Sequence, residues 1–268
     1  MKKQLWVVFI VTLLAGSMAV SSCSDDSCEE EVDYTETFTQ VSTIDAILEG
    51  IYDGVISFSQ LKEYGDFGIG TFEGLDGEMV AIDGDFYQIK ADGVAYEVPD
   101  SMTTPFAQVV FFDVDKTLEL GDETTFKNLG DYVDNELPTE NIFYAIKIEG
   151  TFDYMKTRSV PGQTKPYPPL VEVTANQPTF EFNDVKGTII GFKCPPYMDG
   201  VGVPGYHLHF LTEDRKAGGH ILEIDVADAT ATFDFTSEYF MILPDDSSDF
   251  YDIDLSKDMT EELEEAEQ

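Results

Sequence analysis

Short segments of alternating apolar and polar residues, separated by Asp-Gly pairs, constrain the fold of this chain more than any other feature. The segments cover residues 70–75, 78–82, 85–89 and 94–98, and the pairs between them are Asp76-Gly77, Asp83-Gly84 and Asp92-Gly93. Alternation places every second side chain on one face of a strand. Asp-Gly supplies the positive φ angles of tight hairpin turns. The pattern therefore predicts an antiparallel meander.

Strands also dominate the rest of the chain. Apolar residues at helical spacing predict one helix over residues 42–52, where Ser42 and Asp45 form a capping-box pattern, and another over residues 122–137, ended by Pro138. Period-two patterns predict further strands at residues 106–114 (a pair), 142–148, 151–158, 171–173, 179–182, 187–192, 206–211, 220–226 and 231–235. The predicted fold class is α+β, predominantly antiparallel or mixed β.

A proline-dense stretch at residues 161–169 is the natural boundary between two sheet-rich halves. We predict an N-terminal α+β sheet domain at residues 36–165. Residues 166–268 are predicted to form a C-terminal, β-barrel-like metal-binding domain with an acidic tail.

The first 35 residues are typical of an exported lipoprotein. Lys2 and Lys3 precede an apolar run that is shorter than the roughly 20 residues needed to span a bilayer. Residues 20–23, Val-Ser-Ser-Cys, resemble a bacterial lipobox. We expect a signal peptide at residues 1–22, a lipid anchor on Cys23 and a flexible acidic tether at residues 23–35. The protein would then be exported and anchored to a bacterial membrane, facing the periplasm or the cell surface; the alternative is an ordinary cleavage site beside a chance cysteine.

The net charge narrows the choice of partners. With 15 Lys and Arg against 53 Asp and Glu, the formal charge is −38. Such a charge repels nucleic acid and anionic lipid headgroups, so neither is expected as a partner surface. An anionic substrate would need a local positive centre. Cys194 is the one cysteine in the part expected to fold, so no disulfide framework is predicted.

All three histidines of the chain, His207, His209 and His220, lie within residues 205–220. In a strand, His207 and His209 point to the same face, and a turn at residues 213–219 can place His220 on the neighbouring strand. Three imidazoles on rigid strands suit Zn²⁺ and leave a coordination position open, as in catalytic sites. The alternatives are polar residues of a sheet rim, a closed site with Cys194 as fourth ligand, and another metal such as iron, copper, nickel or manganese.

Three separated blocks resemble bacterial alpha-acetolactate decarboxylases. They are GYHLHFLTEDRKAGGH (205–220), YGDFGIGTFEGLDGE (64–78) and KTRSVPGQTKPYPP (156–169), and the likeness runs from about Val41 to the C-terminus. The resemblance implies decarboxylation of 2-acetolactate to (R)-acetoin and CO2 by a homodimer of sheet-rich subunits. It also implies Zn²⁺ held by His207, His209 and His220. The lipoprotein-like leader departs from the cytoplasmic start of many relatives, which bears on location rather than chemistry.

The resemblance further implies four catalytic residues, Arg158, Glu78, Glu267 and Thr71, with Glu264 as the alternative glutamate of the tail. Arg158 can bind the substrate carboxylate or donate a proton to the carbanion. Zinc would act as a Lewis acid that stabilises the enediolate, so neither pyridoxal phosphate nor thiamin is needed.

Two other functions fit the same histidines. A carbonic-anhydrase-like lyase would use zinc hydroxide and would not need Arg158. A cupin-like lipoprotein that binds a metal or a small molecule would use Glu213 as an additional ligand. Both alternatives stay open at the level of the residues.

Overall fold

The Asp-Gly pairs connect successive strands of a meander in the computed structural model, which describes residues 33–121, 124–246 and 248–267. Its strands are β3 (Phe67–Thr71), β4 (Glu78–Ile82), β5 (Asp85–Ile89) and β6 (Ala95–Glu97), paired antiparallel in that order. Between β4 and β5, Asp83 and Gly84 have φ angles of 53° and 80°. This is the pair of positive angles that a two-residue hairpin turn requires.

The meander belongs to a seven-stranded mixed sheet. The strand order is β14-β1-β8-β3-β4-β5-β6, with β1 (Thr37–Val41), β8 (Ala107–Val110) and β14 (Glu238–Ile242) at one side. Strand β14 pairs parallel with β1, so a strand from near the C-terminus covers one edge of the sheet. The period-two patterns did not predict β14. A separate two-stranded sheet joins β2 (Ile56–Ser57) and β7 (Thr103–Thr104).

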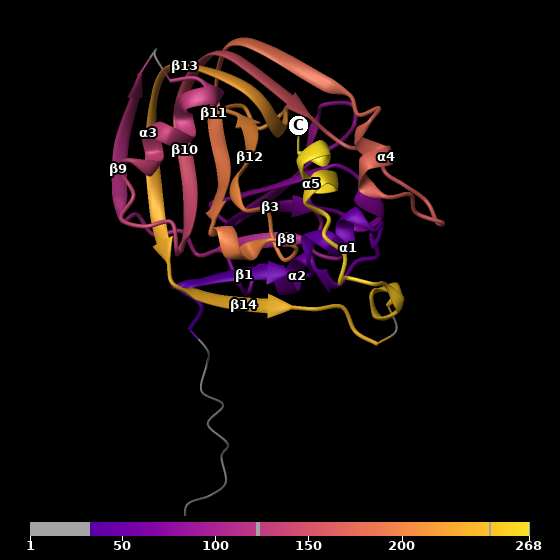
Figure 1. The fold of residues 1–268 in the computed structure, drawn as a ribbon. Helices are drawn as coiled ribbons and strands as arrows, with labels where there is room; N and C mark the ends of the chain where they lie inside the picture. The colour runs from indigo at the N-terminus through magenta and orange to yellow at the C-terminus, as the bar shows by residue number, and fades with distance from the viewer. Residues whose placement is uncertain (1–32, 122–123, 247, 268) are drawn as a thin grey trace, which may run out of the picture. The chain divides into compact units, whose positions relative to one another are not determined.

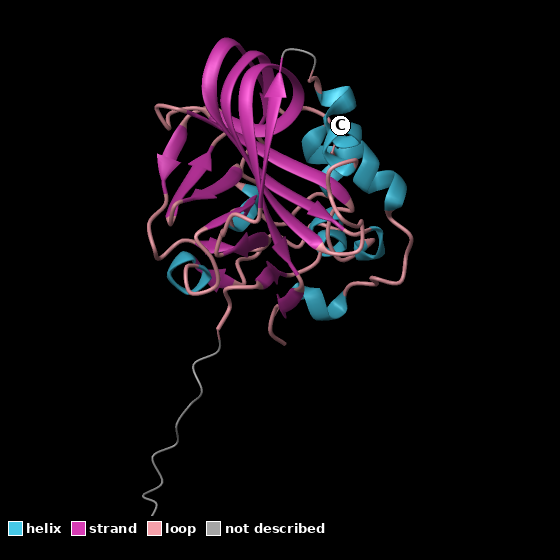
Figure 2. Ribbon diagram, turned by 90° about the vertical axis from the view of Figure 1, so that its left-hand side faces the viewer, coloured by secondary structure: helices cyan, strands magenta, loops and turns pink. Residues whose placement is uncertain are grey.

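The second main sheet curls into a ring. It contains β9 (Lys116–Gly121), β10 (Phe143–Arg158), β11 (Thr179–Cys194), β12 (Gly205–Thr212) and β13 (Gly218–Thr236). Strand β10 pairs with both β11 and β13, which closes the ring, and β9 pairs with the outer part of β13 (Figures 1 and 2). The prediction of a predominantly β fold is confirmed, and the sheet that carries the histidines, predicted to be barrel-like, is ring-like.

The strands of the ring are longer than predicted. Residues 142–148 and 151–158 were expected as two strands and form the single strand β10; β11 and β13 likewise each join two predicted strands. Gly150 does not end β10. A Cβ atom at Gly150 would lie 2.3 Å from the carbonyl oxygen of Asp228 on β13, so this glycine permits the close approach of the two strands.

The helices are short. They are α1 (Ile44–Leu48), α2 (Phe58–Leu61), α3 (Phe126–Asp134), α4 (Leu170–Thr174) and α5 (Thr260–Ala266), with 3-10 turns η1 (Glu73–Leu75), η2 (Pro196–Met198) and η3 (Asp249–Asp252). The predicted cap of the first helix is wrong by one residue: the Thr43 hydroxyl, not that of Ser42, accepts from the Ala46 amide at 3.2 Å. The Ser42 backbone amide donates a hydrogen bond to the Ile242 carbonyl oxygen of β14 and so lies outside the helix.

Residues 171–173 were predicted as a strand and lie in helix α4, so this prediction is wrong. Leu170, Val173 and Thr174 are its buried residues, at the i, i+3 and i+4 spacing of one helical face. Leu170 and Val173 pack in one apolar cluster with residues of α1 and α5. This packing outweighs the strand preference of β-branched residues.

Residues Asp33–Gln268 form a compact unit, in which the ring combines β9 and β10 from before the proline-dense stretch with β11, β12 and β13 from after it. The predicted signal peptide, the lipidated Cys23 and the tether up to residue 32 lie outside the described residues. Within the described part of the chain, no helix has the length and apolar character needed to cross a bilayer.

Candidate metal and active site

Strands β12 and β13 bring the three histidines together. His209 and His220 are register partners, and His207 lies two residues before His209, on the same face of β12. The ring centroids are 5.1, 5.2 and 5.4 Å apart. All three side chains are buried, and one potential ligand atom from each lies within 4.8 Å of the others. The predicted convergence of the histidines on one point is confirmed.

Each imidazole has a buried nitrogen that finds no hydrogen-bond partner among the described residues, namely His207 Nδ1, His209 Nε2 and His220 Nδ1. His209 Nδ1 lies 2.8 Å from the Met79 carbonyl oxygen. Because a carbonyl only accepts, Nδ1 carries the proton and Nε2 holds the lone pair. An unpartnered buried polar atom costs about 1–3 kcal/mol, a cost that metal coordination removes. The residues present therefore fit a divalent metal ion held by imidazoles.

Burial keeps the three imidazoles neutral. It lowers the pKa of His207 to about 3, and the nearby positive charge of Arg158 acts in the same direction. Burial also holds the pKa values of His209 and His220 well below the ordinary range. Neutral imidazole is the form that binds a metal ion.

Arg158, the last residue of β10, lies beside the histidines with its side chain 5% exposed. Its Nη1 donates to Glu78 Oε1 at 3.0 Å, and its Nη2 donates to the Ala266 carbonyl oxygen at 3.0 Å. The Nε atom is buried and has no hydrogen-bond partner within the part of the chain that the structure describes. The guanidinium thus holds a glutamate and the C-terminal helix, and keeps one N–H free for a ligand oxygen.

Glu78 and Glu267 flank the histidines. Glu78 Oε2 lies 3.6 Å from His209 Nε2, while Glu267 Oε2 lies 3.8 Å from His207 Nε2 and 3.6 Å from His220 Nε2. Burial raises the pKa of Glu78 to about 7, although Arg158 opposes the shift. Burial raises the pKa of Glu267 as well. With its pKa near 7, the Glu78 carboxyl group can exchange protons near neutral pH.

The structure distinguishes between the two glutamates considered for the tail. Glu267 follows helix α5 and enters the site, whereas Glu264 is exposed on that helix. Leu263 and Ala266 of α5 are buried against residues of α1 and α4, and Figure 1 shows α5 beside those helices. The tail therefore closes one side of the site.

Thr71 lines the same site but its hydroxyl is already used. Thr71 Oγ1 donates to the Gly77 carbonyl oxygen at 2.7 Å, and Thr71 is the register partner of Glu78. The hydroxyl thus stabilises the turn that precedes Glu78. Thr71 contributes by holding that glutamate in place.

A cavity of about 40 Å³ lies among these side chains. Its lining divides into two parts. The polar part is Thr71, Glu78, Arg158, His207, His220 and Glu267. The apolar part is Ile44, Ile47, Phe106, Val160 and Leu170, together with Gly70.

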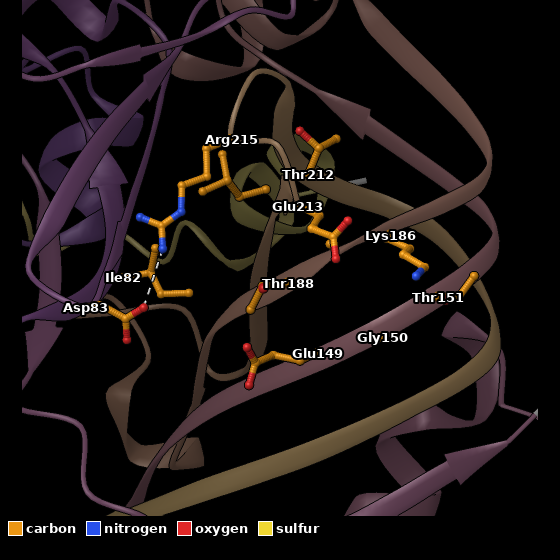
Figure 3. Close-up of a pocket in the computed structure, with 12 residues that line it drawn as sticks. Ile82, Asp83, Glu149, Gly150, Thr151, Lys186, Thr188, Thr212, Glu213 and Arg215 are labelled. Carbon is orange, nitrogen blue, oxygen red and sulfur yellow. Dashed lines mark hydrogen bonds and ion pairs between the residues drawn. The ribbon is translucent and has the colours of Figure 1, made fainter.

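A larger cavity of about 430 Å³ lies elsewhere, around the turn between β12 and β13 (Figure 3). It shares no lining residue with the histidine cavity. Its Arg215 already pairs with Asp85 at 3.0 Å and Asp83 at 3.5 Å. Glu213 is exposed and lines this cavity, so it is not placed with the histidines as a cupin-type ligand would be.

Two parts of the site were missed by sequence reasoning. The Met79 carbonyl orients His209, but any residue offers a carbonyl, so no sequence signal exists. Ile44 and Ile47 lie in the helix predicted over residues 42–52, and they also line the cavity. A helix pattern cannot show which of its apolar residues face a cavity.

Comparison with known proteins gives a consistent result. The family model described as alpha-acetolactate decarboxylase matches residues 38–257. The alpha-acetolactate decarboxylase of Methanosarcina mazei is 52% identical over 87% of this chain and 81% of its own length, and that of Bacillus subtilis is 41% identical over 85% and 89%. The crystal structure of the alpha-acetolactate decarboxylase from Bacillus subtilis strain 168 superposes with a TM-score of 0.84 and 40% identity, over 86% of this chain and 99% of that one.

Proposed function

Since the chain belongs to the alpha-acetolactate decarboxylase family, we propose that it is a metal-dependent carboxy-lyase that converts 2-acetolactate to (R)-acetoin and CO2. One observation carries the proposal: three neutral, buried imidazoles converge on one point, and two of them share a cavity with Arg158 and two carboxyl groups. This set offers a metal site, a positive charge and proton donors within one small space.

The chemistry of the substrate sets three requirements. Its ketone stands next to the carbon that loses CO2, so the bonding electrons can move into the carbonyl and give an enediolate. A divalent ion held by His207, His209 and His220 would supply a Lewis acid for the negative charge that develops on the hydroxyl and ketone oxygens. The carboxylate must be bound and oriented, and a proton must be returned to carbon.

Arg158 meets the requirement that the substrate carboxylate is bound and oriented. Its buried Nε–H has no partner in the described structure and can donate to a carboxylate oxygen, while its charge attracts the anion. Glu78 can return the proton to carbon, because burial raises its pKa to about 7 and leaves a proton on a large fraction of molecules at neutral pH. A proton delivered from one fixed side chain reaches one face of a planar enediolate, as a single enantiomer requires. Glu267 and α5 close one side of the site and thereby limit the access of bulk water.

The direct test supplies racemic 2-acetolactate to the purified, metal-loaded protein and measures acetoin and its enantiomers by chiral gas chromatography. We expect acetoin with a strong excess of the R form. Absence of acetoin from protein of confirmed metal content would contradict the proposal.

We further propose that the resident metal is Zn²⁺, because three imidazoles with an open position match the donor preference of catalytic zinc. Elemental analysis of protein purified without added metal should find about one zinc per chain. Another metal at that stoichiometry would contradict this part alone.

We also propose that the mature chain begins at Cys23, carries a lipid anchor there and forms a homodimer. Intact-mass analysis of the protein from its native membrane should give a chain that begins at Cys23 and carries the added mass of a lipid anchor. Light scattering of the chain from residue 24 onward should give the mass of a homodimer. A chain that keeps its leader or starts at another residue would contradict the proposed lipid anchor. A monomer would contradict the proposed homodimer.

A further inference from the structure

The turn that precedes Glu78 is held between the two strands that flank β4. On the β3 side, Thr71 Oγ1 donates to the Gly77 carbonyl oxygen at 2.7 Å. On the β5 side, Gln88 Nε2 donates to the Asp76 carbonyl oxygen at 2.5 Å and to the Asp76 carboxylate Oδ2 at 3.1 Å. The two neighbouring strands therefore fix the backbone immediately before the glutamate.

Gly77 allows this turn to lie directly against β5. Its φ angle is 98°, in the region that favours glycine. A Cβ atom at this position would lie 2.3 Å from the Ile89 carbonyl oxygen, so the turn is in close contact with the strand that carries Gln88. Because the turn has no room to move further toward β5, the Gln88 amide serves to keep it from moving away.

Gln88 itself lies away from the reacting groups. Glu78 and Ile89 are register partners, as are Met79 and Gln88, so the Gln88 side chain points to the opposite face of the sheet from Glu78. Gln88 is 4% exposed and does not line the histidine cavity. This buried amide therefore acts on the site through the backbone that leads into β4.

The position of Glu78 matters because two contacts depend on it. Its Oε1 accepts from Arg158 Nη1 at 3.0 Å, and its Oε2 lies 3.6 Å from His209 Nε2. A proton donor must lie within hydrogen-bond reach of the atom that it serves, and a displacement of about 1 Å can cost about 100-fold in rate. A turn that moves away from β5 would carry Glu78 out of this arrangement.

We propose that Gln88 is a positioning residue that holds the Asp76-Gly77 turn and thereby sets Glu78 for the return of a proton to the substrate. This inference rests on the proposed function. It assigns a role to a buried amide outside the cavity, distinct from the residues that would bind the metal, bind the carboxylate or transfer the proton.

The same sheet offers two matched controls. Gln108 of β8 is 0% exposed, and its Nε2 donates to Gln40 Oε1 at 3.0 Å, so Gln108→Met removes an equivalent buried amide that does not contact the turn. Lys90 Nζ binds the same Asp76 Oδ2 at 2.7 Å, but its side chain is 39% exposed, so Lys90→Met removes a surface ion pair that contributes little. A general loss of stability would affect Gln88→Met and Gln108→Met alike.

Hydrogen exchange tests the hold on the turn without reference to activity. Deuterium uptake by the backbone amides of residues 75–79 should be at least about threefold faster in Gln88→Met than in wild type, and close to wild type in both controls. Gln88→Glu is a second variant, since its ionised carboxylate keeps the size of the side chain but cannot donate to the Asp76 carbonyl oxygen. Unchanged uptake in both Gln88 variants, or an equal increase in Gln108→Met, would overturn the inference.

Steady-state kinetics with 2-acetolactate test the effect on Glu78. Gln88→Met should keep the wild-type metal content, leave KM within about threefold and lower kcat by about 10- to 100-fold. In a Glu78→Gln background the same change should alter kcat by less than about twofold, because the glutamate that Gln88 positions is gone. Equal losses of kcat in the two backgrounds would mean that Gln88 supports the fold as a whole, and the inference would be wrong.

The proposed function can fail separately from this inference. Lack of acetoin from 2-acetolactate with metal-loaded wild-type protein would refute the proposed function. The exchange comparison of Gln88→Met with Gln108→Met would be unaffected by that result, so the two failures are distinguishable.

Discussion

A buried aspartate beneath the C-terminal helix should make the protein less stable as the pH rises. Asp45 of α1 is 7% exposed. Burial raises its pKa to about 6 from an ordinary 3.8, and the carboxylates of Asp199, Asp258, Glu262 and Glu49 act in the same direction. Between pH 3.8 and about 6 the folded protein retains a proton that the unfolded chain has released. The free energy of unfolding therefore falls as the pH rises through this window and stays low above it.

The size of the effect follows from the shift. A change of about two pKa units corresponds to about 3 kcal/mol above pH 6. Two terms reduce the gain expected from Asp45→Asn. The carboxylate lies in the first turn of α1, where the helix dipole stabilises a negative charge by about 0.3–1 kcal/mol, and solvent screens part of the repulsion from neighbouring acids. We expect Asp45→Asn to be more stable than wild type by about 2 kcal/mol at pH 8, and by about half as much at pH 5.

Urea unfolding at pH 5 and pH 8, followed by tyrosine fluorescence and circular dichroism, measures this difference. Glu264→Gln is the control, because it removes the same charge from an exposed position on α5 and should change stability by less than about 0.5 kcal/mol at either pH. An Asp45→Asn variant that is less stable than wild type at pH 8, or whose gain is larger at pH 5, would refute the reasoning.

Three further predictions concern the site. Arg158→Gln should retain its metal and lose about 10²–10³-fold in acetolactate turnover. The carbonic-anhydrase-like function would be favoured if the wild type formed no acetoin and if CO2 hydration survived in Arg158→Gln. Glu213→Gln should keep full metal content and activity, since Glu213 is exposed in the β12–β13 turn; loss of metal on elemental analysis would support the cupin-like function. Removal of metal with a chelator should lower Tm in differential scanning calorimetry. Zn²⁺ at about 100 times its Kd should restore about 2.7 kcal/mol of the free energy of unfolding. An unchanged Tm after full metal removal would argue against a site formed by the folded chain.

The metal site could be predicted from the sequence because its geometry is local. The spacing of His207 and His209 fixes a common face in a strand, and one hairpin brings His220 into register with His209. The rest of the site depends on distant pairings. Glu78 and Arg158 are 80 residues apart in sequence and meet at 3.0 Å, which no periodicity can show. Their place in the site came from the family resemblance.

The errors in the predicted secondary structure also come from contacts between segments that are distant in sequence. Glycine at position 150 is a breaker by local rules, but the neighbouring strand β13 approaches so closely that only glycine fits there. Residues 171–173 have strand propensity, but α4 buries Leu170 and Val173 against α1 and α5. In both cases contacts with segments far away in sequence decide the local conformation.

The site also explains how so acidic a chain can hold an anionic substrate. The formal charge of the whole chain is −38, yet the imidazoles are neutral and Arg158 is buried beside them. A divalent ion on the triad together with Arg158 would bring three positive charges against at most two from Glu78 and Glu267. Burial raises the pKa of both glutamates, which makes the local balance more positive still. Because buried charges are screened far less than charges on the surface, this small positive centre acts more strongly on a substrate carboxylate than the distant surface acids do.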